Sequence, residues 1–217
     1  IRGRYSVIGL MPDLIWRCKG NKAEICYSDT IKEDEFVECS KDSLNSLRKL
    51  YEDSKIDIPE GLPPMSCGLV GTMGYDMVKL MEELPSTKPD SIDIPDACFI
   101  RPKIMVIFDA VTDKIFIVTS IYTHRERVDA QAAYAAAAKR IHYVLDRLAA
   151  PVPENTNNNY QPVSVADFTS NTTRKKYDEM LEKAREYIRA GDIFQVVLSQ
   201  RFSANFTLPP FALYRAL

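Results

Sequence analysis

Residues 191–202 read GDIFQVVLSQRF, a glycine followed by a run with the composition of a β-strand. Alternate side chains of a strand point to opposite faces of a sheet. One face would carry four apolar side chains: Phe194, Val196, Leu198 and Phe202. The other face would carry Gln195, Val197, Ser199 and Arg201. An amide, a hydroxyl and a guanidinium together can hold a hydroxylated ligand that bears a carboxylate. An ordinary exposed strand face is the alternative, and periodicity alone does not decide between the two.

An amphipathic helix is predicted directly before this strand. Cap-forming side chains occur at residues 171–173, and Gly191 can adopt the left-handed conformation that ends a helix. The apolar residues between them follow the i, i+3, i+4, i+7 spacing of a helix: Tyr177, Met180, Leu181, Ala184, Tyr187 and Ile188. We therefore expect this helix to dock its apolar side and to turn at Gly191 into the strand.

The first two thirds of the chain predict antiparallel sheet with flanking helices. Gly20 and Asn21 favour a tight turn between two apolar runs, and a second strand pair is predicted over 103–109 and 114–122. Besides the helix described above, helices are predicted at three places: residues 42–51, which Ser40 or Asp42 can cap, residues 125–149, and, near the end of the chain, the segment opened by Pro209 and Pro210. In the second helix the predicted core stripe is Val128, Ala132, Ala135, Ala138, Ile141, Leu145 and Leu148. The expected fold class is α+β, with mostly antiparallel sheets.

A break in this pattern separates the chain into two parts. Residues 150–163 read APVPENTNNNYQPV, with three prolines, four asparagines and no apolar period. We therefore expect an N-terminal region over 1–149, a linker over 150–165 and a second region over 166–217. Because the chain begins at Ile1 and stops inside an apparent helix, we also expect it to be a piece of a longer protein.

Composition excludes several classes of function. A formal net charge of -2 and a pI near 5.8 give no electrostatic attraction to nucleic acid or to an anionic membrane. The five cysteines are odd in number and none form a C-x-x-C pair, which indicates reduced thiols and a cytoplasmic location. The sequence contains neither a signal peptide nor an apolar run long enough to span a membrane.

Three spaced glycines, one carboxylate and two histidines have structural interpretations rather than functional ones. The glycines at 68, 71 and 74 match neither a dinucleotide fingerprint nor a phosphate loop, and they indicate close backbone packing in a sheet. Asp76 is interpreted as the cap of a short helix. Two isolated histidines, His124 and His142, are interpreted as structural.

Four segments carry a resemblance to a known family. They are YIRAGDIFQVVLSQRF (187–202), RYSVIGLMP (4–12), CGLVGTMGYDMVKLMEELP (67–85) and PDACFIRPKIMVIFD (95–109). In this order and spacing they resemble the chorismate-utilising enzymes, and among these the anthranilate synthase component I branch. Agreement of several segments is a more specific signal than any one motif.

The resemblance implies a lyase that converts chorismate and ammonia to anthranilate and pyruvate. It also implies Mg²⁺, a glutamine amidotransferase subunit that delivers the ammonia, assembly into a hetero-oligomer, and feedback inhibition by tryptophan. Family members that add water have a lysine at the position of Gln195, where it can act as a general base. Ammonia already has a lone pair, so an amide suits an ammonia user and argues against an isochorismate or salicylate synthase.

The resemblance also implies which residues of this chain belong to binding sites and which site residues lie outside it. Gln195, Ser199 and Arg201 are the substrate-pocket candidates, and Arg4, Tyr5 and Ser6 are candidates for the tryptophan pocket. The acid, base and Mg²⁺ ligands of the family are expected beyond Leu217, so no metal ligand and no complete catalytic set is assigned to this chain, which alone should be inactive. Two alternatives stay open: aminodeoxychorismate synthase component I, whose members tend to differ at Phe194 and Val197, and a non-catalytic module that binds tryptophan or the partner subunit.

Overall fold

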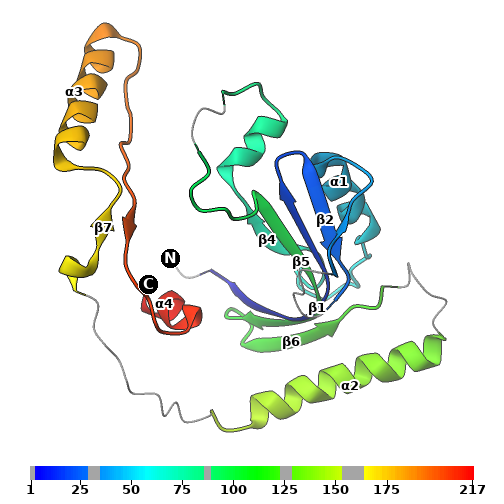
Figure 1. Ribbon diagram of the computed structural model, residues 1–217. Helices are drawn as coiled ribbons and strands as arrows, with labels where there is room; N and C mark the ends of the chain where they lie inside the picture. Colours follow the sequence, from blue (N-terminus) through cyan, green and yellow to red (C-terminus); the bar gives the residue numbers. More distant parts are fainter. Residues whose placement is uncertain (1–2, 29–34, 86–88, 123–128, 153–163) are drawn as a thin grey trace. The chain divides into compact units, whose positions relative to one another are not determined.

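The computed structural model describes residues 3–28, 35–85, 89–122, 129–152 and 164–217. Contacts divide the chain into two compact units, Ile1–Pro151 and Val152–Leu217. Figure 1 shows the elements of both units in sequence colours. Most of the predicted linker, including residues 153–163, lies outside the described residues. None of the helices in the described ranges has the length and hydrophobicity needed to cross a membrane.

The first unit contains one antiparallel sheet (Figure 1). Its strands are β1 (Tyr5–Lys19), β2 (Lys22–Cys26), β3 (Val37–Glu38), β4 (Val70–Met73), β5 (Ala97–Asp109) and β6 (Lys114–Thr119). The order is β3-β2-β1-β5-β4, and β6 also pairs with β5. The predicted hairpin at Gly20, whose φ is +53°, and the predicted pair across residues 110–113 are both confirmed. The predicted α+β class with antiparallel pairing is therefore correct.

A β-bulge divides β1 into two halves that face opposite ways. Leu10 pairs with Ile104, but Leu14 pairs with Arg101, so the register shifts between Pro12 and Leu14. One extra residue moves every following side chain to the other face. Leu10 and Leu14 both have even numbers, yet Leu10 joins the cluster around Ile104, whereas Leu14 joins a different core cluster. The residues before and after the bulge thus form one bent strand.

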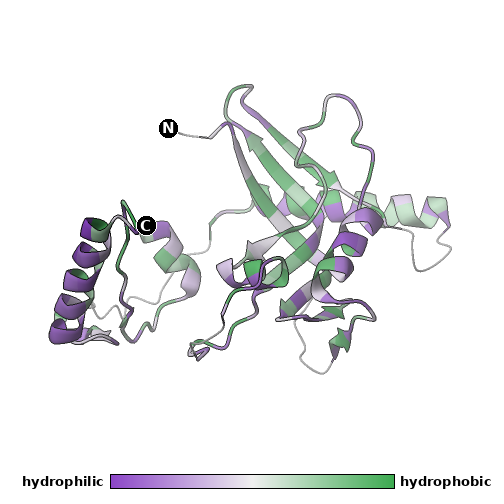
Figure 2. Ribbon diagram, turned by 90° about the horizontal axis from the view of Figure 1, so that it is seen from above, coloured by the Kyte–Doolittle hydropathy of each residue, from purple (hydrophilic) through white to green (hydrophobic). Residues whose placement is uncertain are grey.

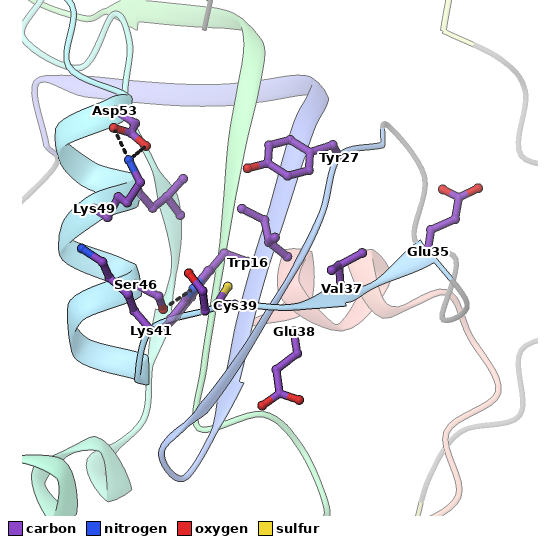
Figure 3. Close-up of a pocket in the computed structure, with 13 residues that line it drawn as sticks. Trp16, Tyr27, Glu35, Val37, Glu38, Cys39, Lys41, Ser46, Lys49 and Asp53 are labelled. Carbon is purple, nitrogen blue, oxygen red and sulfur yellow. Dashed lines mark hydrogen bonds and ion pairs between the residues drawn. The ribbon is translucent and has the colours of Figure 1, made fainter. Parts of the chain in front are cut away.

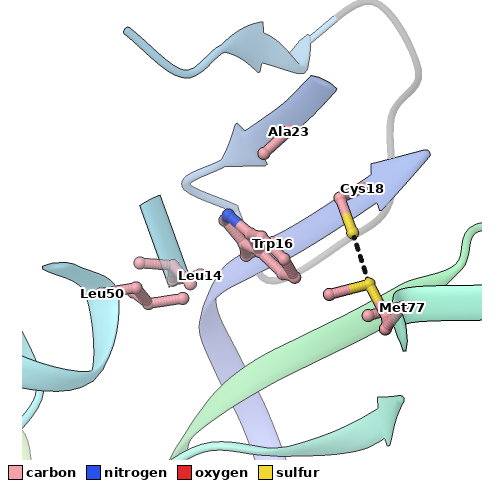
Figure 4. Packing of buried hydrophobic residues seen from close by; sticks show 7 residues of the cluster. Leu14, Trp16, Cys18, Ala23, Leu50 and Met77 are labelled. Atoms are coloured by element: carbon pink, nitrogen blue, oxygen red, sulfur yellow. Dashed lines mark hydrogen bonds between the residues drawn. The ribbon is translucent and has the colours of Figure 1, made fainter. Parts of the chain in front are cut away.

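Helix α1 (Ser43–Asp53) covers one face of the sheet. Asp42 caps it, as the sequence allowed, by accepting the backbone N–H of Asn45 at 2.9 Å. Trp16 lies fully buried beneath the helix and donates its indole N–H to Ser46 Oγ at 3.0 Å. The remaining buried members of this cluster, drawn in Figure 4, are Leu14, Cys18, Ala23, Leu50, Met77 and Ala97.

Helix α2 (Ala130–Ala149) packs against the opposite face, beside β6 (Figure 1). The alternation along β5 places Ile104 and Val106 on this face, where Val144 of α2 contacts them. The predicted stripe is largely wrong, because Ala132, Ala135, Leu145 and Leu148 are exposed, whereas the buried residues of this helix are Ala137 and Val144. An alanine-rich helix offers several similar stripes, so its docked face is weakly specified by sequence. Residues 125–128 of the predicted helix lie outside the described residues.

Gly71 shows why a strand of this sheet requires glycine. A Cβ at this position would lie 2.0 Å from the Cys98 carbonyl oxygen. The prediction of close backbone packing is therefore confirmed for Gly71. The short 3-10 helix η2 (Tyr75–Leu80) follows, and Gly74 occupies its N-cap position without a side-chain cap. Asp76 instead pairs with Lys79 at 2.7 Å, so its predicted capping role is wrong.

The second unit has little core of its own. It contains η3 (Val165–Asp167), β7 (Thr169–Ser170), α3 (Arg174–Ala190), β8 (Phe202–Ser203) and α4 (Pro210–Ala216). Figure 2 shows α3 as mostly hydrophilic, in contrast to the hydrophobic strands of the first unit. Among its described side chains, only Ala184 is both apolar and buried.

Candidate functional site

The helix before the candidate strand forms as predicted. Thr173 caps α3 by accepting the backbone N–H of Lys176, and Gly191 ends it with φ +81°. Of the predicted stripe, Ala184 is buried and Tyr187 and Ile188 are nearly half exposed. The chain leaves this helix at Gly191 and enters the segment with the substrate-pocket candidates.

The predicted strand over 194–202 is largely wrong. Residues 193–201 form no regular strand, and the pairing is confined to Phe202 and Ser203 of β8, opposite β7. Phe194 is 94 % exposed, so it is not buried under α3 as expected. A strand requires a neighbour that accepts its backbone hydrogen bonds, and within the described residues β7 supplies only a two-residue neighbour.

The three substrate-pocket candidates are all exposed. Gln195 and Ser199 lie in the irregular segment, and Arg201 lies just before β8. Arg201 is held through its backbone, since its N–H donates to Asn171 Oδ1 at 2.9 Å and its carbonyl accepts the Asn171 N–H at 3.0 Å. The structure thus places the three residues on one extended segment, and it fixes only the Arg201 end of that segment.

Two residues that contact this segment, Ser170 and Asn171, were not predicted as site residues from the sequence. The Ser170 hydroxyl donates to Gln200 Oε1 at 2.9 Å, and Asn171 makes the two bonds to Arg201. These residues are separated from their partners by 30 positions. In the sequence Asn171 carried a signal only as a possible helix cap, and no local pattern pointed to Ser170 or to its partner Gln200.

The tryptophan-pocket candidates lie where β1 begins. Arg4 donates from Nε and Nη2 to the two oxygens of Asp109 at 3.0 and 2.7 Å, and its guanidinium also lies over the Tyr5 ring at 4.8 Å. Ser6 is exposed and pairs with Phe108 in the sheet. Arg4 therefore fastens the start of β1 to the end of β5. A ligand at this segment would meet Arg4 with its ion pair already formed.

Asp109 is a buried carboxylate that pairs with Arg4 at this end of the sheet. Its side chain is only 3 % exposed, whereas that of Arg4 is 49 % exposed. The guanidinium of Arg4, followed by the backbone N–H of Val111, holds the pKa of Asp109 well below its usual range. The same pairing raises the pKa of Arg4. Asp109 is thus a charged structural group that also closes the turn between β5 and β6.

A second ionic cluster holds the β1–β2 hairpin against residues 89–96. The ammonium of Lys19 bridges Asp90, at 2.9 Å, and Asp93. The backbone N–H of Asp93, with the Lys19 ammonium next in importance, lowers the pKa of Asp90 to about 2. Asp96 accepts the backbone N–H of Gly20 in the hairpin turn. Lys19, Asp90 and Asp93 thus satisfy one another's charges.

The described residues contain no cluster of side chains that could bind a metal ion. No three His, Cys, Asp or Glu side chains among them lie close enough together to hold a metal ion. The described residues therefore do not fit a Mg²⁺ site. His142 Nδ1 lies 2.8 Å from the carbonyl oxygen of Ala138, one turn earlier in α2, and His124 lies outside the described residues. The five cysteines, all of them described, are free thiols.

A cavity of about 730 Å³ lies between α1 and the β2–β3 edge of the sheet (Figure 3). We call it the helix–sheet pocket. Its sheet wall is Trp16, Ile25, Tyr27, Val37 and Cys39, its helix wall is Ser46, Lys49, Leu50 and Asp53, and Lys41 lies at the turn between them. None of these residues was predicted as a site residue from the sequence. The available signal is the alternation of Ala23, Ile25 and Tyr27, which is typical of a strand face and does not indicate a cavity.

Comparison with known proteins places the chain in a family. Residues 11–217 match the family described as chorismate binding enzyme. Anthranilate synthase component 1 of Cereibacter sphaeroides is 42 % identical over 217 residues, which are 100 % of this chain and 43 % of that protein. The component 1 protein of Thermus thermophilus is 37 % identical over 218 residues, covering 100 % of this chain and 42 % of the relative.

Solved structures agree with this assignment. The crystal structure of anthranilate synthase component I from Streptococcus pneumoniae TIGR4 matches with a TM-score of 0.74 and 28 % identity, over 100 % of this chain and 45 % of that chain. The chain thus spans less than half the length of these relatives. Because the family match covers nearly all of its residues, the chain belongs to the chorismate-binding enzyme family.

Proposed function

We propose that this chain is the N-terminal portion of the large subunit of an anthranilate synthase, a lyase of tryptophan biosynthesis. The intact enzyme would convert chorismate and ammonia to anthranilate, pyruvate and water. The observation that carries this proposal is the family match over residues 11–217, together with full-length coverage of the chain by relatives named anthranilate synthase component 1.

Gln195 is the residue of this chain that we assign to the choice of nucleophile. Its amide is uncharged and cannot take a proton from water, whereas a lysine with a lowered pKa could do so. Ammonia attacks through its own lone pair and needs no such base. We further propose that Ser199 and Arg201 contact the hydroxyl and carboxylate groups of chorismate. In the described structure these side chains are exposed, so the pocket would need neighbouring strands to close over them.

The proposal extends to organisation and regulation. We assign residues 1–149 to the N-terminal region, 150–165 to a linker and 166–217 to the start of the chorismate-binding domain. Arg4, Tyr5 and Ser6 remain our candidates for a tryptophan pocket. A partner glutamine amidotransferase would supply ammonia within a hetero-oligomer, Mg²⁺ would bind outside this chain, and the protein would act in the cytoplasm. The 217 residues alone would then be inactive.

A chimera tests the function. The chain is joined at Leu217 to the segment that follows the matched region in the Cereibacter sphaeroides relative, and it is assayed with chorismate, ammonium and Mg²⁺. We expect anthranilate and pyruvate in equal amounts from the chimera and neither from the 217 residues alone. An aminated product that keeps its enolpyruvyl group would indicate an aminodeoxychorismate synthase and contradict the proposal. A folded chimera that forms no product, but binds tryptophan, would favour a non-catalytic module.

A variant of the same chimera tests the role of Gln195. Replacing Gln195→Lys should divert part of the chorismate to hydroxylated products and lower the yield of anthranilate, because the amine gives water a base. Gln200→Lys, five positions away, is the matched control, since it adds the same charge to the same segment. Unchanged product ratios in Gln195→Lys, or equal diversion in the control, would refute the assigned role.

A further inference from the structure

The segment that carries the substrate-pocket candidates is stretched between two anchor points. Helix α3 has 17 residues and is therefore about 25 Å long. The chain leaves this helix at Gly191, and by Arg201 it has returned to Asn171, which precedes the helix (Figure 1). The ten residues 192–201 can span at most about 33–36 Å. They must therefore be nearly extended to cover the length of α3, even though they form no regular strand.

Asn171 binds both polar groups of the Arg201 backbone. Its Oδ1 accepts the Arg201 N–H at 2.9 Å, and its own N–H donates to the Arg201 carbonyl oxygen at 3.0 Å. These bonds continue the β7–β8 ladder by one pair, since Ser170 already pairs with Phe202. The backbone of Arg201 is therefore held as in a strand, although β7 has ended.

The orientation of the Asn171 amide is fixed by its partners. Because a backbone N–H can only donate, the oxygen of this amide must face Arg201. The Thr172 hydroxyl donates to the same oxygen at 3.0 Å. An aspartate at position 171 would present an oxygen at the same place, whereas an alanine would present none.

The hold on the Arg201 peptide also sets the direction of the neighbouring side chains. Gln200 lies on the same face as Ser170, because its Oε1 is 2.9 Å from Ser170 Oγ. Successive side chains of an extended chain point to opposite faces. Ser199 and Arg201 therefore share the opposite face, next to each other and before any further strand covers them.

We propose that Asn171 is a positioning residue of the chorismate site. It holds the Arg201 backbone so that the side chains of Ser199 and Arg201 face the hydroxyl and carboxylate groups of the substrate together. The inference rests on the proposed function and deepens it, because it adds a residue that acts through Arg201 without touching the substrate.

Amide hydrogen exchange in the 217-residue chain, followed by NMR, tests the hold on Arg201. Asn171→Ala should speed the exchange of the Arg201 N–H about five-fold or more, because that group loses its acceptor. Asn171→Asp should keep the slow exchange. Asn205→Ala, at an exposed asparagine of the same unit, is the matched control and should leave this exchange unchanged. Equal exchange in Asn171→Ala and in the control would overturn the proposal.

The kinetics of the chimera described above test the role at the substrate. The readout is chorismate consumption, so the result does not depend on which aminated product forms. Asn171→Ala should raise the KM for chorismate about five-fold or more and change kcat less than about two-fold, because a displaced Arg201 weakens the ground state and the transition state equally. A merely structural defect would reduce the folded fraction, which lowers kcat and leaves KM unchanged. Asn171→Asp should restore the KM of the parent.

A double variant shows whether Asn171 acts through Arg201. In a chimera that already carries Arg201→Met, adding Asn171→Ala should change KM less than about two-fold, because the positioned group is gone. The proposal is overturned if the two effects on KM multiply, if Asn171→Ala leaves KM unchanged, or if aspartate fails to restore it. A parent chimera that consumes no chorismate would instead refute the proposed function and with it the role at the substrate.

Discussion

The ion pair between Asp13 and Arg101 should be among the most costly to break in the first unit. Asp13 is the extra residue of the β1 bulge, and its carboxylate accepts from Arg101 Nε and Nη2 at 2.9 and 3.0 Å. The Arg101 side chain is 7 % exposed. It also donates to Ser54 Oγ at 3.2 Å and lies over the Tyr122 ring at 3.8 Å. Replacing Asp13→Leu would leave this guanidinium buried without a counter-charge.

The expected cost follows from what Arg101 loses and keeps. Removing one partner of a buried pair costs about 3–5 kcal/mol. Arg101 keeps its bond to Ser54 and its ring contact, so we expect about 3 kcal/mol, a large part of the roughly 5–15 kcal/mol that stabilises a typical domain. In the double variant Asp13→Leu with Arg101→Met no charge remains buried. Its cost should fall at least about 2 kcal/mol below the sum of the two single costs.

Urea unfolding followed by Trp16 fluorescence measures these costs. Trp16 is fully buried in the same sheet, so its emission reports the unfolding of the first unit. Lys55→Met is the control, because it breaks an exposed ion pair and should change stability very little. The reasoning is refuted if Asp13→Leu costs no more than this control, or if the double variant equals the sum of the singles within about 0.5 kcal/mol.

Three further outcomes are expected. The pKa of Asp90 is held at about 2, below its ordinary value, so the stabilisation from this group is complete above about pH 4 and is lost as the pH falls through about 2. The melting temperature should therefore drop less between pH 4 and 2 in Asp90→Asn than in the parent. Parallel curves of melting temperature against pH would contradict this. Gly71→Ala should lower stability by at least about 1–3 kcal/mol in urea unfolding, because its Cβ would collide with the Cys98 carbonyl oxygen, and a neutral substitution would show that β4 can move away. The chain should self-associate as its concentration rises, since residues 192–217 expose several aromatic side chains; a strictly monomeric chain in light scattering would refute this.

Local signals in the sequence were enough to predict many of the elements. The hairpin turn at Gly20, the cap at Asp42 and the left-handed end at Gly191 each depend on a few neighbouring residues, and all three form as predicted. The bulge in β1 was not predicted, because its carboxylate is paired with Arg101, 88 positions away. Periodicity describes a strand that keeps its register, so it cannot show where one extra residue reverses the two faces.

The segment 193–201 shows a different limit of sequence reasoning. Its alternating apolar and polar residues are typical of a strand that is buried on one side, but a strand also depends on hydrogen bonds from a neighbour. In the described structure β7 supplies such bonds only to Phe202 and Ser203. Phe194 is therefore 94 % exposed in spite of its pattern. The same fact explains why Gln195 and Ser199 lie open to solvent, because side chains of one face form a pocket only when neighbouring strands hold that face in place. The candidate site was thus predicted from the residue types, whereas its closure depends on strands that this unit does not provide among its described residues.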